Sequence, residues 1–82
     1  ASEEIGTLRV WPDSPAAGMS LADLELKDHG IRLLAVHRGD ETLSSQDMDF
    51  LLLPDDKIIL LGPEESIHKI GELFASREDQ KS

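Results

Sequence analysis

The strongest strand signal in this 82-residue chain is Ile31-Arg32-Leu33-Leu34-Ala35-Val36-His37-Arg38. Apolar side chains stand at both odd and even positions, so an extended strand here would be apolar on both faces. A second stretch of the same kind runs from Lys57 to Leu61. Strands of this type are usually central in a sheet and covered on both sides. The pattern therefore predicts two central strands.

Two shorter segments predict further strands. Residues 5–11 alternate between apolar and polar side chains, which is typical of a strand with one face in the core. After the turn pair Gly39-Asp40, the dipeptide Thr42-Leu43 can form a brief returning strand. We expect a polar loop over residues 44–47 before the second central strand.

The segment between the first two strands carries a helix signal. Ser20 is a good N-cap, and Asp23 stands three residues later as an acidic variant of the capping box. A short helix is therefore expected from Leu21 to about Leu26. Gly30 ends this stretch, at a backbone position that we expect to need positive φ.

A second helix is expected to begin at Pro63, which suits the first helical position. Its apolar stripe follows helical spacing at Ile67, Ile70, Gly71 and Phe74. The whole order predicts an α+β domain, with a small, mostly antiparallel sheet of about four strands, one short helix and one C-terminal amphipathic helix. The expected core comprises Leu33, Ala35, Ile58, Leu60, Ile67, Ile70 and Phe74.

The chain reads as one domain between two flexible ends. We expect a flexible leader over residues 1–4, the domain over residues 5–75 and a flexible tail over residues 76–82. The tail has no apolar anchor, and such ends usually fray.

The charge balance excludes several functional classes. The chain has 8 Lys and Arg against 17 Asp and Glu, which gives a net charge of −9. A chain this acidic lacks the basic footprint that nucleic acids need. Its apolar runs are short, so we expect no direct insertion into a membrane. The absence of cysteine excludes disulfides, thiolate metal sites and thiol catalysis.

No catalytic constellation is visible. The glycines form neither a dinucleotide-binding motif nor a P-loop. The three histidines are His29, His37 and His68, and solvated side chains are the simplest interpretation of each. A His-carboxylate-Ser arrangement assembles in space and leaves no fixed spacing, but no nucleophile elbow is present. We therefore expect that this chain is not an enzyme and needs no cofactor.

A group of aspartates offers the only candidate metal site. They are Asp47, Asp49, Asp55 and Asp56. Their spacing does not match an EF-hand, and an Asp-Asp pair before a strand is more often turn chemistry. We expect no bound metal.

One pair of side chains could bind an anion. His37 and Arg38 stand where a central strand leaves the sheet, and arginine pairs bidentately with carboxylates and phosphates. The alternative is that Arg38 pairs with nearby Asp40 or Glu41 on the surface. The spacing favours the surface pair and leaves both interpretations open.

Three segments together resemble the TrkA-C domain, also called the C-terminal RCK subdomain. They are PAAGMSLADLEL at residues 15–26, GIRLLAVHRG at residues 30–39 and LPDDKIILLG at residues 53–62. In that family a small-residue turn with glycine leads into a short helix, a glycine precedes the next strand, a Gly-Asp turn follows, and a helix closes the domain. The resemblance covers about residues 5–75.

The resemblance implies regulation and not catalysis. Domains of this family lie in the cytoplasm as parts of channels, transporters and antiporters for potassium or other monovalent cations, or in their separate regulatory subunits. They commonly form homodimers, and some bind a cyclic dinucleotide at the dimer interface. The expected partners are therefore a second copy, a membrane-embedded transport domain and a small anionic or nucleotide ligand. The candidate ligand-binding residues are Arg32, His37, Arg38 and Asp56.

The chain departs from the family pattern at two places. Asp55-Asp56 stands where the family has Gly-Asp, so the acid is kept and the glycine is lost. Family members that read a cyclic dinucleotide have an Asn just ahead of the second strand and an Arg in the preceding helix. The corresponding places here hold Arg32 and Leu26.

Two functions from different classes follow. The first is a cytosolic regulatory domain of a cation transport protein, acting by ligand sensing, dimerisation or both. The alternative is a stand-alone adaptor whose acidic surface binds a basic partner. Two strands that are apolar on both faces present more hydrophobic surface than two short helices cover, which predicts a two-fold homodimer.

Overall fold

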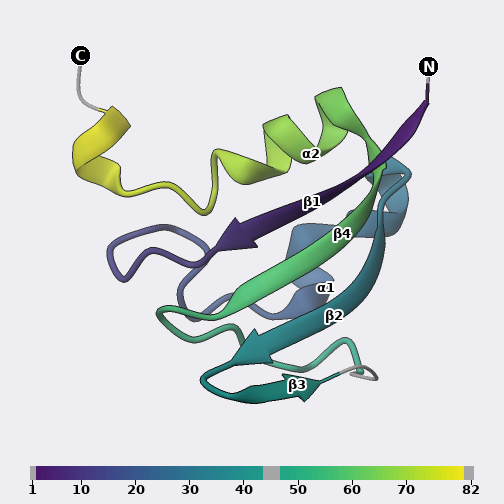
Figure 1. The fold of residues 1–82 in the computed structure, drawn as a ribbon. Coiled ribbons are helices and arrows are strands. Elements are labelled where there is room, and N and C mark those ends of the chain that lie inside the picture. The colour runs from purple at the N-terminus through teal and green to yellow at the C-terminus, as the bar shows by residue number, and fades with distance from the viewer. Residues whose placement is uncertain (1, 44–46, 81–82) are drawn as a thin grey trace.

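The computed structural model of the chain describes residues 2–43 and 47–80 (Figure 1). Four strands, two α-helices and two short 3₁₀ turns follow one another in this part of the chain. In order they are β1 (Glu3–Arg9), α1 (Leu21–Leu24), η1 (Leu26–His29), β2 (Arg32–Arg38), β3 (Glu41–Leu43), β4 (Lys57–Pro63), α2 (Glu64–Gly71) and η2 (Arg77–Gln80). The strands form one antiparallel sheet in the order β1-β4-β2-β3. The predicted α+β class is confirmed.

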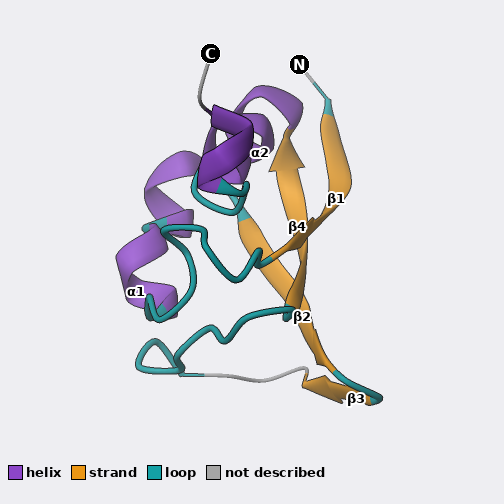
Figure 2. Cartoon of the chain, turned by 90° about the vertical axis from the view of Figure 1, so that its left-hand side faces the viewer, coloured by secondary structure: helices purple, strands orange, loops and turns teal. Residues whose placement is uncertain are grey.

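The two doubly apolar stretches form the central strands β2 and β4, as predicted. The described helices cover only one of their faces, so apolar strand surface stays open on the other, as expected for two short helices (Figure 2). Figure 2 shows α1 and α2 on the same side of the sheet, with no helix on the other side. We call this other side the open face. The cross-strand register places on it Ile5, Thr7, Arg32, Ala35, Ile59 and Leu61.

A β-bulge in β2 changes which of its side chains enter the core. Leu33 lies opposite Leu60, but the register shifts before Ala35, which lies opposite Ile59 on the open face. The shift brings Val36 into the core, where it is fully buried. The prediction that Ala35 is a core residue is therefore wrong, because one extra residue reverses the alternation of a strand. Leu33 is half-buried and packs against the core.

The short helix begins as predicted and ends earlier. Ser20 and Asp23 form the capping box, with a distance of 3.2 Å from the Asp23 nitrogen to Ser20 Oγ and 3.0 Å from the Ser20 nitrogen to Asp23 Oδ2. Glu25 then adopts a left-handed conformation with φ of 52°, so α1 ends at Leu24 and the chain continues as η1. Gly30 has φ of 70°, as predicted.

The second helix is shorter than its apolar stripe. Pro63 is its N-cap and not its first residue, and the helix ends at Gly71. Phe74 lies beyond the helix and is still only 2% exposed. Tertiary packing holds it there, since its carbonyl accepts a hydrogen bond from the Trp11 N–H at 3.2 Å. The predicted core residues Ile58, Leu60, Ile67, Ile70 and Phe74 are buried.

The ends of the domain differ in detail from the expected boundaries. β1 begins at Glu3, so two residues of the expected leader pair with β4, opposite Pro63 and Gly62. Main-chain pairing needs no apolar side chain, which is why alternation alone did not extend the strand. The turn η2 lies within the expected tail. Residues 44–46 of the expected polar loop lie outside the described residues.

Candidate functional site

Arg38 and Asp56, two of the predicted site residues, form an ion pair at the end of β2. Arg38 Nε donates to Asp56 Oδ1 at 2.9 Å, and Arg38 Nη2 donates to Asp56 Oδ2 at 2.8 Å. Asp56 is 1% exposed, and its Oδ2 also accepts the Leu53 N–H at 2.8 Å. Arg38 Nη2 donates further to the Leu51 carbonyl at 3.0 Å. The pair thus holds the loop before β4 against the end of β2.

This geometry decides which partner Arg38 takes. The side-chain hydrogen bonds to Asp56 raise the pKa of Arg38, with further Coulombic attraction from Asp56 and Glu41, against a lowering by burial. The expected surface partners Asp40 and Glu41 do not hydrogen-bond the guanidinium in the described structure. The guanidinium also stacks over the Phe50 ring, with Cζ 4.7 Å from the centroid. Both charges of the pair are satisfied within the fold.

The turn that leads into Asp56 explains one departure from the family pattern. Asp55 stands where the family has glycine, and its φ is 73°. Glycine adopts this left-handed conformation freely, and aspartate is one of the few other residues that tolerate it. The Asp55 carboxylate also forms an ion pair with Arg9.

The other two predicted residues do not join Arg38 and Asp56. His37 is half-buried and lies opposite Lys57 and Thr42 in the sheet. Arg32 lies at the opposite end of β2, about 17 Å from His37 at the usual rise of a strand. The four predicted residues therefore do not form one site.

Arg32 lines a pocket at the N-terminal end of β2. The pocket has a volume of about 370 Å³ and is lined by Glu3, Lys27, Gly30, Ile31, Arg32 and Leu61. Lys27 brings a second cation to it, which the sequence interpretation missed. The left-handed Gly30 turns the chain from η1 into β2, and Lys27 before this turn and Arg32 after it both line the pocket. The signal available in the sequence was the position of Lys27, three residues before the turn glycine Gly30. We call this the Arg32 pocket.

The Arg32 pocket adjoins an apolar strip of the open face. Ile5 on β1 is 69% exposed, and it lies opposite Leu61 on β4. Ile59 and Ala35 continue the strip and are only half-buried. An exposed aliphatic strip of this kind is a candidate for contact with another protein surface.

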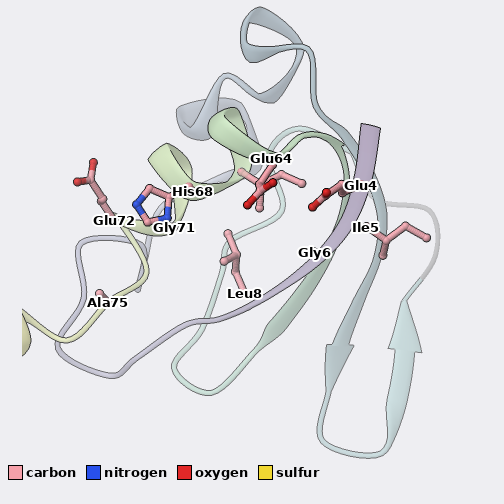
Figure 3. A pocket seen from close by; sticks show the side chains of 10 residues that line it. Glu4, Ile5, Gly6, Leu8, Glu64, His68, Gly71, Glu72 and Ala75 are labelled. Atoms are coloured by element: carbon pink, nitrogen blue, oxygen red, sulfur yellow. The ribbon is translucent and has the colours of Figure 1, made fainter. Parts of the chain in front are cut away.

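A second, larger depression lies on the helix side between β1 and α2 (Figure 3). Its volume is about 460 Å³. Two glycines let the helix lie close to the strand here. A Cβ at Gly6 would stand 2.9 Å from Ile67 Cγ2, and one at Gly71 would stand 3.3 Å from Leu8 Cδ2. We call this depression the β1–α2 groove.

Within the described residues there is no cluster of three or more His, Asp or Glu that could hold a metal ion. The described helices include none that is long and apolar enough to cross a membrane.

Comparison with protein families gives one match, to the TrkA-C domain over residues 6–75. The chain belongs to the TrkA-C domain family. This confirms the family resemblance seen in the sequence, and the membership supports a regulatory role for this TrkA-C domain. The search of curated proteins found no match.

Solved structures show the same fold. The RCK C domain of the potassium transport protein KtrA, in complex with cyclic diadenosine monophosphate, has a TM-score of 0.74 and 25% sequence identity. The match covers 85% of this chain and 81% of that one. The RCK_C domain dimer of S. agalactiae BusR, in complex with the same dinucleotide, has a TM-score of 0.72 and 18% identity. The match covers 85% of this chain and 93% of that one.

The GsuK channel bound to NAD is also similar to this TrkA-C domain, with a TM-score of 0.68 and 20% identity. The match covers 89% of this chain and 14% of the channel. This chain therefore corresponds to a small part of that much longer protein.

Proposed function

We propose that this TrkA-C domain is a non-catalytic, cytoplasmic regulatory domain of a potassium or other monovalent-cation transport protein. The observation that carries the proposal is the family match over residues 6–75, together with the likeness to the KtrA domain at 25% identity. In this role the domain senses a small anionic ligand and pairs with a second copy. The membrane-embedded transport domain of the parent protein receives the signal.

The Arg32 pocket is the ligand site in this proposal. Lys27 and Arg32 both line it, against the single carboxylate of Glu3, and two cations in one pocket suit a phosphate group. The Arg38–Asp56 pair keeps the loop before β4 in place and does not touch the ligand, because both of its charges are already satisfied. His37 lies too far along β2 to reach the same phosphate.

The open face is the dimer surface in this proposal. Arg32 and Leu61 belong to the Arg32 pocket and also to the open face. A two-fold dimer through this face therefore places two Arg32 pockets at one interface. A ligand with two phosphates is the natural occupant of such a shared site.

Calorimetric titration of the 82-residue chain with cyclic diadenosine monophosphate tests the ligand, with NAD and inorganic phosphate as comparison probes. We expect the dinucleotide to bind and to promote dimerisation in sedimentation. Arg32→Ala should weaken binding by about tenfold or more, as expected for the loss of hydrogen bonds to a charged group. Lys69→Ala, on the exposed side of α2, is the matched control. Equal weakening by both variants, or no binding of any of the probes, would contradict the proposal.

A further inference from the structure

The β1–α2 groove is separate from the Arg32 pocket and the open face. In Figure 3, Leu8 points into the space between the strand and the helix, and Ile5 points away from it. The apolar floor consists of Leu8, Ile67 and the two close-approach glycines Gly6 and Gly71. No part of the proposed ligand-sensing function uses this floor.

Beside the groove runs the outer edge of β1. β1 is the first strand of the sheet, so within the described residues only β4 pairs with it. The Val10 N–H donates to the Asp56 carbonyl, whereas the next N–H, of Trp11, points the other way and donates to Phe74. Main-chain groups of successive strand residues point to opposite edges. The N–H and C=O groups of Ile5, Thr7 and Arg9 therefore point outward, away from β4.

Carboxylates mark both ends of the groove. Glu4 and Glu64 lie near each other at one end, and Glu72 lies at the other end beside His68 (Figure 3). Glu64 and Glu72 are separated by eight positions, or about 12 Å at the rise of a helix. Two side chains at positions i and i+4 of an extended strand are about 13 Å apart and point to the same side. The spacing of the acidic ends therefore matches alternate side chains of an added strand.

We propose that the outer edge of β1 and the β1–α2 groove bind an extended polypeptide segment, which joins the sheet as an additional strand. The segment presents an aliphatic side chain to the apolar floor, with a basic side chain two residues before it and another two residues after it. The outward N–H and C=O groups of Ile5 and Thr7 supply the main-chain hydrogen bonds. Addition of a strand to an open sheet edge is a general mode of peptide recognition.

The charges select a basic segment over a second copy of this chain. A symmetric pairing of two β1 strands about Gly6 would place Glu4 of each copy opposite Leu8 of the other. That arrangement puts a carboxylate against the apolar floor, and both copies carry a net charge of −9. A basic segment instead meets opposite charge at both ends of the groove.

The probe is the capped peptide acetyl-Thr-Lys-Thr-Leu-Thr-Lys-Thr-amide, titrated into the isotopically labelled 82-residue chain and followed by NMR. We expect the amide signals of β1 and of the groove residues on α2 to shift, and those of β3 to stay in place. Three matched peptides separate the contributions of charge, apolar contact and main-chain hydrogen bonds to binding. One has Glu in place of both Lys residues, one has Ser in place of Leu, and one carries N-methyl groups on the amides that would pair with β1. Each should bind more weakly than the parent peptide.

Two substitutions test the same surfaces from the side of the protein. Glu64→Lys should weaken binding of the basic peptide by about threefold or more and should strengthen binding of the acidic peptide. Glu65→Lys, next to it and outside the groove, is the control and should leave the preference for the basic peptide unchanged. Thr7→Pro removes one outward N–H and should therefore reduce peptide binding. Proline is tolerated at a free strand edge, so the variant should still fold. A thermal melt of each variant shows whether it remains folded.

Three results would overturn the proposal. The first is that the basic and acidic peptides bind equally well, and the second is that the N-methylated peptide binds like its parent. The third is that the signals of the groove residues on α2 shift with protein concentration alone. A dimer through the open face would leave those signals in place, so this result would assign the edge and groove to a second copy. The proposal does not depend on the dinucleotide: Arg32→Ala should leave peptide binding unchanged, and Glu64→Lys should leave dinucleotide binding unchanged.

Discussion

Arg38 and Asp56 lie 18 residues apart in the sequence and share two hydrogen bonds, one to each carboxylate oxygen. Asp56 is almost fully buried, whereas the side chain of Arg38 keeps 35% of its surface exposed. The pair joins the last residue of β2 to the residue just before β4. A buried carboxylate without its cation is costly, so the structure depends on this pairing.

Replacing one partner should therefore destabilise the domain strongly. We expect Arg38→Met to lower the free energy of unfolding by about 3 kcal/mol, near the lower end for a broken buried pair because the guanidinium is partly solvated. The double variant Arg38→Met with Asp56→Leu should lose less than the sum of the single variants. Urea denaturation of the four proteins measures the coupling. Additive losses would show that the two residues stabilise the fold independently.

The raised pKa of Arg38 also predicts how this contribution depends on pH. Because the pKa of Arg38 is higher in the folded state, its stabilising contribution is fully present at neutral and mildly alkaline pH and is lost only in strong alkali. The difference in unfolding free energy between the wild type and Arg38→Met should therefore be constant from about pH 6.5 to about pH 9. Urea titrations at several pH values check this. A steady decline across that range would point to another titrating group.

The two faces of the sheet should respond differently to truncation of isoleucine. Ile70→Ala, at a site that is 3% exposed, should cost about 2–5 kcal/mol of unfolding free energy. Ile5→Ala, at a site that is 69% exposed, should change stability by less than about 0.5 kcal/mol. Thermal or urea melts compare the two. An unchanged melt for Ile70→Ala would contradict the packing of α2 on the sheet.

Gly6 should be intolerant of even a methyl group. Gly6→Ala places a Cβ 2.9 Å from Ile67 Cγ2, so we expect a loss of about 1–3 kcal/mol from overpacking. Combining it with Ile67→Ala removes the clashing atom, and the double variant should lose less than the sum of the two single losses. Additive losses would show that the loss in Gly6→Ala does not come from the contact with Ile67.

Homodimer formation through the open face should strengthen as salt increases. Each copy carries a net charge of −9, and salt screens the repulsion between them. Sedimentation at about 50 mM and about 500 mM salt should show a rising dimer fraction. Ile5→Asp should reduce that fraction, whereas Met48→Asp, exposed elsewhere on the surface, should not. A concentration-independent 9.0 kDa monomer at both salt concentrations would contradict dimerisation of this chain.

Several features of this protein were determined by sequence alone, because they depend on residues within a few positions of each other. The alternation and double-faced runs predicted four strands, with β2 and β4 central. The spacing of Ser20 and Asp23 predicted the start of α1, and Gly30 predicted a left-handed turn. The family resemblance likewise rested on short motifs in order.

Other features were decided only by the tertiary structure, because they depend on residues far apart in the sequence. The bulge that moves Ala35 to the open face follows from how β2 pairs with β4. The partner of Arg38 is Asp56 because the fold brings the loop before β4 against the end of β2. Lys27 and Arg32 share a pocket with Leu61, which lies 29 positions beyond Arg32. Local patterns predict which secondary structure each segment forms. Only long-range packing determines which surfaces remain open for a ligand or a partner.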